Sequence, residues 1–330
     1  MIEDNVTVCA TLRNFKSDSD YLSFGDAHDG FWIQKLTDEE REHLCKSAIG
    51  FTNYPYDNFL VGRHYYIGRG KSNSVLQDNA NWLFSPLFRA MKLFRTGDVV
   101  MPIAFYSWKG KYRSMRLHGE NYGGGFGLKG NPYVFNVSDI KIFSDFFTEL
   151  GAYLKNGDFG VIPYHKPPEM LKSIDFRHHF AVHALLKGSS EHSNPFIIFD
   201  KLIDYTIAFE SLYLLKRDKQ KGTPLSARVA TLLGKDATDE RQLAAAVKQF
   251  YDLRNDLVHA SFIDDRGSDF LCENIYKYED VLRRSILAFL DLNKRASTKE
   301  EIIKTLDEAA KQPSLRKDIQ DKAKLLNMTA

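Results

Sequence analysis

The sequence predicts an α+β protein in which a strand-rich N-terminal domain is followed by an all-α helical-bundle domain. The chain has 330 residues, more than a single hydrophobic core usually supports. Its first half contains short β-branched and aromatic runs separated by Gly, Asn, Asp and Ser. After the proline-dense stretch 162–168, almost every segment has the spacing of an amphipathic helix. We therefore expect one domain over 1–165 and a second over 166–330.

Composition and charge restrict the classes of protein to which the chain can belong. Hydrophobic residues make up 43% of the chain and charged residues 27%, which argues against extensive disorder. Lys and Arg total 45 against 43 Asp and Glu, so the net charge of +2 excludes a polybasic protein but not a local patch for nucleic acid. The three cysteines form no C-x-x-C pair, as is typical of a reduced, cytoplasmic chain. Because no signal segment and no run of about 18 apolar residues is present, we expect no membrane partner.

Both strands and helices are expected in the N-terminal domain. One helix follows the Thr37 cap, with an acidic first turn. A second covers 81–94 and ends at Thr96-Gly97, and a third covers 138–155. The strands are expected at 6–12, 58–61, 65–67, 99–106 and 133–135.

The C-terminal domain is expected to consist of helices alone. Its apolar residues recur every three to four positions, which is the period of a helix with one buried face. The expected helices cover 169–187, 196–217, 225–233, 239–260, 270–294, 298–311 and 314–326.

Segment 249–261 contains the residues of greatest chemical interest. On a helix its apolar stripe consists of Leu243, Phe250, Leu253 and Leu257. Asn255 and His259 lie on the polar side with Lys248, four residues apart, so their side chains can meet. Arg254 lies beside the stripe and, at about 100° per residue, about 140° from His259. Either the helix is distorted there, or a second copy of it supplies the missing group.

A purely structural interpretation of these two residues is also open. An Arg beside an apolar stripe commonly packs its stem and keeps its charge in water or in an ion pair, and a His near a helix end is commonly structural. Composition alone therefore does not decide whether Arg254 and His259 are catalytic or structural.

The hexapeptide Arg254–His259 (RNDLVH) resembles the R-x-x-x-x-H motif of HEPN domains, including the Asn that frequently follows the Arg. Upstream segments resemble the same family in the same order. These are 87–97, like the segment before the domain; 175–180 and 199–204, like the start of the ApeA-like branch; 204–215, like the acidic helix; and 225–233, like the short Arg-bearing helix.

The resemblance implies a metal-independent endoribonuclease without cofactors that acts as a homodimer on RNA, in a toxin or phage-defence setting. In that mechanism His259 is the general acid or general base, because the ordinary pKa of an imidazole lies near 6.5. Its expected place in the last helical turn, near Asp256, favours the protonated form. Arg254 holds the phosphate, and Asn255 orients His259 or donates to a phosphate oxygen. Glu210, Asp256 and Arg228 are the candidates for supporting positions around these catalytic residues.

The sequence also allows other interpretations. The HEPN-like domain can be a non-catalytic dimerisation or RNA-binding module, or the N-terminal domain can sense a phage component or small molecule. Glu210 falls in an apolar stripe, so its carboxylate either pairs with Arg228 or Arg254 or borders the active site. The basic run 216–221 is either a solvated loop or an RNA backbone contact. His179 and His183 have i,i+4 spacing but lack the carboxylate of a zinc helix, so no metal is expected.

Overall fold

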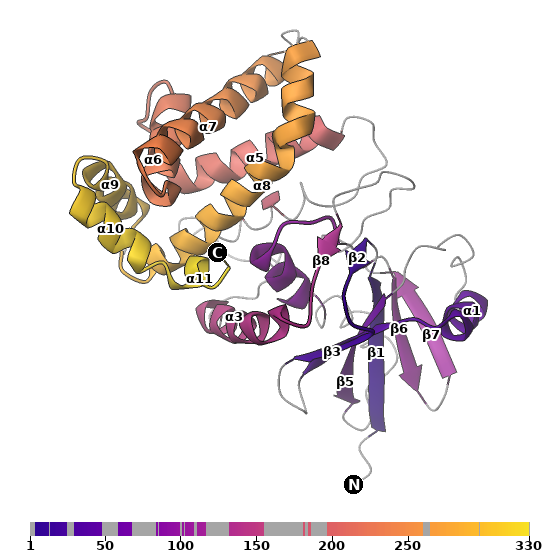
Figure 1. Cartoon of the computed structure of the whole chain (residues 1–330). Helices are drawn as coiled ribbons and strands as arrows, with labels where there is room; N and C mark the ends of the chain where they lie inside the picture. Colours follow the sequence, from indigo (N-terminus) through magenta and orange to yellow (C-terminus); the bar gives the residue numbers. More distant parts are fainter. Residues whose placement is uncertain are drawn as a thin grey trace. The chain divides into compact units, whose positions relative to one another are not determined.

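A computed structural model describes most of the chain, and its residues fall into two compact units. The first unit comprises Met1–Gly160 with Ser190–Ser193, and the second Val161–Ser189 with Asn194–Ala330. Strands and helices are described in the first unit and only helices in the second, so the fold is α+β (Figure 1). The residues described are 4–12, 14–24, 30–47, 59–67, 84, 86–99, 101, 103–108, 111–116, 132–154, 181, 184–185, 197–259, 265–296 and 298–329.

An antiparallel sheet forms the first unit. In the part of the chain that is described it has six strands in the order β3-β4-β5-β1-β6-β7. β1 lies in the interior of the sheet and pairs along its full length with β5, from Asp4 opposite Ile67 to Leu12 opposite Phe59. The strands are β1 (Asp4–Leu12), β3 (Tyr21–Phe24), β4 (Phe31–Lys35), β5 (Phe59–Ile67), β6 (Ile103–Trp108) and β7 (Lys111–Arg116).

The sheet differs from the sequence expectation in three ways. Segments 58–61 and 65–67 are one strand, β5, and the indole of Trp32 crosses it at Gly62, where an added Cβ would collide with the ring. The strand expected at 99–106 begins only at Ile103, after Pro102, which lacks the N–H that a ladder needs. Strands β3, β4 and β7 were not predicted, since β3 and β4 are only four and five residues long.

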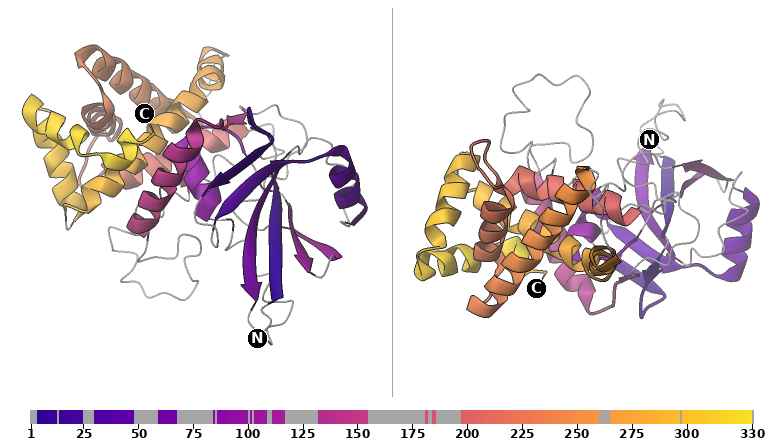
Figure 2. Two further views of the ribbon diagram at one scale, coloured as in Figure 1. Left: turned by 60° about the horizontal axis from the view of Figure 1, so that its bottom comes forward. Right: turned by 90° about the horizontal axis from the view of Figure 1, so that it is seen from above.

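Helices flank this sheet. α1 (Asp38–Ser47) lies by β7 and α3 (Asp139–Leu154) by β3 (Figures 1 and 2). The expected cap of α1 is present as a reciprocal pair, because Glu40 N–H donates to Thr37 Oγ1 at 3.1 Å and Thr37 N–H donates to Glu40 Oε2 at 2.9 Å. The helix expected at 81–94 is described at 84 and 86–94, and the chain turns at Gly97 with φ +150°, a conformation that favours glycine.

A phenylalanine-rich core lies beneath α3. Ring contacts at 5.1–5.5 Å join Phe135 and Phe94 to Phe143 and Phe146 of this helix. The short parallel pair β2 (Phe15–Lys16) and β8 (Tyr133–Val134) contributes further rings to the same core. Arg95 ties the start of α3 to the preceding segment through two bonds to the Asp139 carboxylate, at 2.8 and 2.9 Å.

The second unit is a bundle of helices. α5 packs against α8, and α6 packs against α7 as an antiparallel pair. Stacked rings of Phe209, Tyr278 and Phe250, 4.8 and 4.0 Å apart, join α5, α8 and α7. The helices are α5 (Ile197–Tyr213), α6 (Gly222–Leu233), α7 (Ala237–Val258), α8 (Asp265–Asn293), α9 (Lys299–Ala309), α10 (Pro313–Asp321) and α11 (Lys324–Asn327).

Most expected helices of this unit are present with shifted ends. The helix expected over 314–326 is two helices, α10 and α11, with a break at Lys322–Ala323. Of the helix expected over 169–187, only residues 181, 184 and 185 are described, and they are helical. The proline-dense stretch 162–168 and the family-like segment 175–180 lie outside the described residues.

Candidate active site

α7 presents the candidate motif at its C-terminal end. The helix begins at Asp236, whose side chain accepts hydrogen bonds from the N–H groups of Thr238 and Asp239 at 2.8 and 2.9 Å. It continues without interruption to Val258, and His259 follows as the C-cap. A distortion of the helix between Arg254 and Val258, one of the two possibilities raised by the sequence, is therefore not observed.

The buried face of α7 differs from the stripe expected from the sequence. Its buried residues are Val247, Phe250 and Tyr251, whereas Leu253 and Leu257 are only half-buried. Arg254 lies within about 20° of Val247 around the helix axis, so it belongs to the inward face rather than beside it. Its Nε atom is buried and has no hydrogen-bond partner among the described residues, and the side chain as a whole is half-buried.

The motif residues make few contacts with one another. Arg254 Nη1 donates to Asn255 Oδ1 at 3.2 Å, whereas Asn255 meets His259 only through its backbone carbonyl, which accepts the His259 N–H at 3.0 Å. Asn255 therefore contacts the arginine and does not orient the imidazole. His259 and Asp256 are both exposed, and no side-chain hydrogen bond joins either of them to the described part of the chain. The imidazole stands at the carbonyl end of α7.

Beneath Arg254 lies a polar group shared by α5, α7 and α8. Tyr251 Oη donates to Glu210 Oε1 at 3.0 Å. Burial together with the Glu210 carboxylate raises the pKa of Tyr251 to about 12, while the positive charge of Arg254 acts in the opposite direction. Burial also raises the pKa of Tyr278, whose hydroxyl is near enough to Glu210 and Arg254 to be influenced by both charges. Glu210 thus lies on the Arg254 side of the bundle.

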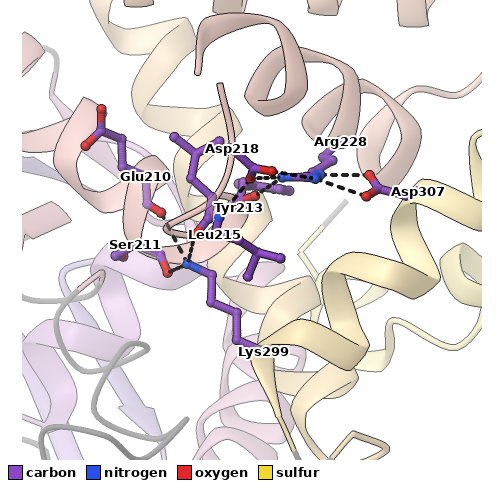
Figure 3. Close-up of polar contacts among 9 residues, drawn as sticks. Glu210, Ser211, Tyr213, Leu215, Asp218, Arg228, Lys299 and Asp307 are labelled. Atoms are coloured by element: carbon purple, nitrogen blue, oxygen red, sulfur yellow. Dashed lines mark hydrogen bonds and ion pairs between the residues drawn. The ribbon is translucent and has the colours of Figure 1, made fainter. Parts of the chain in front are cut away.

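The interpretation of Glu210 as the ion-pair partner of Arg228 is wrong. Figure 3 shows the Glu210 carboxylate pointing away from Arg228. Arg228 instead donates from Nη1 to Asp218 at 2.6 Å and makes a two-bond contact with Asp307, from Nε at 2.8 Å and Nη2 at 3.0 Å. This arginine therefore links α6 to α9 and to the loop before α6, and it makes no hydrogen bond to the described motif residues.

Several residues of this region were not singled out from the sequence. Lys299 is buried, and its Nζ donates to the backbone carbonyls of Glu210, Ser211 and Leu214 at the end of α5, at 3.3, 2.5 and 2.5 Å (Figure 3). A helix C-terminus leaves its last carbonyls short of N–H donors, so the buried cation supplies a donor there, although the Glu210 carbonyl also accepts the Leu214 N–H at 3.1 Å. Tyr251 could have been found from its spacing to Val247, but nothing local marks Lys299.

The arrangement offers a specific but incomplete set of chemical groups. Arg254 supplies a permanent cation, Asn255 a donor beside it and His259 an exposed titratable ring. Because Arg254 and His259 are about 140° apart on a regular helix, one copy does not direct both at the same atom.

Within the ranges described, no group of three or more His, Cys, Asp or Glu residues is placed to hold a metal; His179 and His183 lie outside those ranges. None of the described helices has the length and apolar character needed to cross a bilayer. No protein-family model, curated protein or solved structure matches the chain.

Proposed function

We propose that the chain is a metal-independent endoribonuclease of the HEPN type that works as a homodimer, as a cytoplasmic toxin or phage-defence effector. The observation that carries the proposal is the regular course of α7 through the R-x-x-x-x-H segment. Such a helix places Arg254 and His259 on different faces, so a phosphate can meet both groups only if a second copy contributes one of them.

An apolar fringe on α7 supports pairing of two copies. Leu253 and Leu257 are half-buried, and Val258, at 49% exposed, is the most exposed large aliphatic residue in the described part of the second unit. Their position beside the motif means that a partner covering this fringe would also bring its own motif close.

The chemistry assigned to each residue follows from its charge and position. In each site one His259 takes the proton of the ribose 2′-hydroxyl or gives one to the leaving 5′-oxygen, and solvent completes the other proton transfer. Arg254 and Asn255 donate to the phosphate oxygens as charge develops on the phosphorane. Attack by the 2′-oxygen on its own phosphate leaves a 2′,3′-cyclic phosphate and a free 5′-hydroxyl, so no metal-bound water is required.

Cleavage in the presence of a chelator tests this proposal. Wild-type protein and His259→Ala are incubated with a labelled RNA in excess EDTA, and the product ends are identified. The wild type should cut at an unchanged rate and leave 2′,3′-cyclic phosphates, and His259→Ala should lose about 10²–10⁴-fold in rate. Loss of wild-type cleavage on chelation, or full cleavage by His259→Ala, contradicts it.

A non-catalytic HEPN-like module for dimerisation, RNA binding or ligand sensing is the second candidate. It is favoured by the inward position of Arg254, next to Tyr251 and Tyr278, and by the absence of any side chain within the described ranges that orients His259. Under this candidate RNA is bound but not cut, whereas sensing of a phage component or small molecule would fall to the N-terminal unit. The cleavage assay distinguishes the two.

A further inference from the structure

The loop between α5 and α6 concentrates positive charge on the surface of the second unit. It contains four cations, Lys216, Arg217, Lys219 and Lys221. All four side chains are exposed, and none of them lies within ion-pair distance of a carboxylate in the described part of the chain. Gln220, the only other residue exposed in the loop, is polar. The loop therefore presents charge and amide groups but no exposed apolar side chain.

The only acidic residue of the loop is turned inward. Asp218 accepts hydrogen bonds from the Leu215 N–H at 2.8 Å and from Arg228 Nη1 at 2.6 Å (Figure 3). Partial burial alone would raise the pKa of Asp218, but the bonds from Arg228 and Leu215, the charge of Arg228 and, as the smallest contribution, the charge of Arg217 outweigh it and lower that pKa. Since Asp218 is engaged with Arg228, four positive charges face outward with little compensation.

The loop is also anchored at both ends. Lys299 binds the carbonyl of Ser211 in the last turn of α5 and that of Leu214 just after it, and the Asp218–Arg228 pair is tied to α9 through Asp307. Gln220 adopts a left-handed conformation with φ +47°, and its carbonyl accepts the Thr223 N–H at 2.9 Å. A loop fixed in this way loses less conformational entropy when it binds a partner.

The end of this loop lies against α7 near the motif. At Gly222, the first residue of α6, an added Cβ would lie 2.8 Å from Cδ1 of Tyr251, so only glycine permits this close approach. Tyr251 precedes Arg254 by three residues, which places the two on the same face of α7. The basic loop and the R-x-x-x-x-H segment therefore occupy the same end of the α6–α7 pair.

From these observations we infer that the loop 216–221 binds the phosphodiester backbone of single-stranded RNA and guides it to the motif end of α7. The inference rests on the proposed function and names its substrate-binding surface. Evenly repeated negative charge suits four unpaired cations that follow one another along a fixed loop. A protein partner fits less well, because the hot spots of protein interfaces are usually buried aromatic or aliphatic anchors, and this loop exposes none.

Binding of an uncleavable probe at several salt concentrations tests the inference. The probe is a fluorescent twelve-nucleotide 2′-O-methyl oligoribonucleotide, which keeps the phosphates but lacks the attacking hydroxyl. The test variant replaces Lys216, Arg217, Lys219 and Lys221 by Gln. The control variant makes the same change at four other exposed lysines of the unit: Lys235, Lys304, Lys311 and Lys317. Thermal unfolding checks that both variants remain folded.

The expected result is a selective loss in the loop variant. Each phosphate contact to a single strand contributes about 0.7 to the slope of log K against log salt, so removing four contacts should lower the slope by about 2–3 and the affinity by more than about tenfold. The control variant should match the wild type within about threefold. Equal effects in both variants, no binding by the wild type, or a loop-dependent affinity for poly-glutamate but not for the probe would overturn the inference.

The cleavage assay keeps this result separate from the proposed function. If the probe is bound through the loop but RNA is never cut, the RNA-binding surface stands and the endoribonuclease proposal fails. If RNA is cut, and the loop variant cuts and binds as well as the wild type, the endoribonuclease proposal stands and the RNA-binding role of the loop fails.

Discussion

The Tyr251 hydroxyl on α7 donates a 3.0 Å hydrogen bond to the Glu210 carboxylate on α5, directly below the inward face that carries Arg254. This bond gives a carboxylate in an otherwise apolar stripe a partner, and it fixes α7 to α5 about one turn before the R-x-x-x-x-H segment begins. The position of the motif therefore depends on a contact between two helices that the sequence analysis did not identify.

Tyr251→Phe should lower the free energy of unfolding by about 1–2 kcal/mol, because it leaves a half-buried carboxylate without its donor. Tyr21→Phe is the control, since its side chain is 56% exposed and its hydroxyl makes no hydrogen bond to the described part of the chain. Its removal should change stability by less than about 0.5 kcal/mol. Urea unfolding at neutral pH measures both. Equal effects of the two changes would contradict the role given to the Tyr251–Glu210 bond.

The same tyrosine predicts a dependence of stability on alkaline pH. The pKa of Tyr251 is raised from 10.0 to about 12 in the folded protein, so the neutral form is favoured there. The stabilisation is complete below pH 10 and is lost as pH rises toward 12, because the unfolded chain ionises first. Between pH 10 and 12 the free energy of unfolding should fall less steeply with pH for Tyr251→Phe than for the wild type. Identical slopes of unfolding free energy against pH in the two proteins would contradict the raised pKa of Tyr251.

Acid should weaken the Asp218–Arg228 ion pair that holds the loop between α5 and α6. The pKa of Asp218 is lowered below its ordinary 3.8, so its stabilising contribution is present above that value and is lost as pH falls through the folded-state pKa. At neutral pH, Asp218→Asn should cost about 3 kcal/mol, because it breaks a largely buried pair with Arg228. Asp318→Asn, in the half-exposed pair with Lys322, should cost less than about 1 kcal/mol. Chemical unfolding between pH 7 and 2 checks both, and an acid profile unchanged in Asp218→Asn would contradict the argument.

Much of the fold could be predicted because its signals are local. The Thr37 cap, the helical periods of the second unit and the turn at Gly97 each depend on neighbours in sequence. The short strands β3 and β4 carry too few alternating residues to be distinguished from loops, and they are defined only by pairing with β5 and with each other. The end of α5 at Tyr213 was placed too late, since it is marked by Lys299, a residue far along the chain.

The site could be predicted less completely than the fold. The motif was located from the spacing of Arg254 and His259, but the sequence placed Arg254 beside the buried face, whereas it lies on it. The apolar residues of α7 predicted the wrong buried face. Leu253 and Leu257 are only half-buried, whereas Tyr251 is buried and its hydroxyl is hydrogen-bonded to Glu210. The partners of Arg228 come from two different elements, so residue types alone did not identify them.

The apolar fringe predicts a homodimer in solution. Val258→Glu should convert the dimer to monomer, because it places a charge in the surface that a second copy would cover. Ile142→Glu, at a site of nearly equal exposure on α3 in the other unit, should leave the assembly unchanged. Light scattering at micromolar concentration measures the mass of each. A monomeric wild type would contradict the prediction.

Arg254 should require its guanidinium and not only its charge. Arg254→Lys keeps the cation but loses the planar donor fork, so the cleavage rate should fall by about 10²–10³-fold, nearly as far as in Arg254→Ala. Arg241→Lys, at an exposed position of the same helix, is the control and should cut like the wild type. Single-turnover cleavage with circular dichroism on each variant measures this. Full activity in Arg254→Lys would contradict the requirement for the guanidinium, because the charge alone would then be sufficient.

The measurement that tests the account most directly is cleavage by a mixture of two inactive proteins. Arg254→Ala and His259→Ala are each inactive in the proposed mechanism, but a mixed dimer keeps one site with an intact arginine from one copy and an intact histidine from the other. After subunit exchange, half of the dimers are mixed and each has one working site of two, so the mixture should recover about one quarter of the wild-type rate. If the mixture cuts RNA no faster than its two components do alone, while the wild type cuts under the same conditions, the site is not shared between copies and the account is wrong.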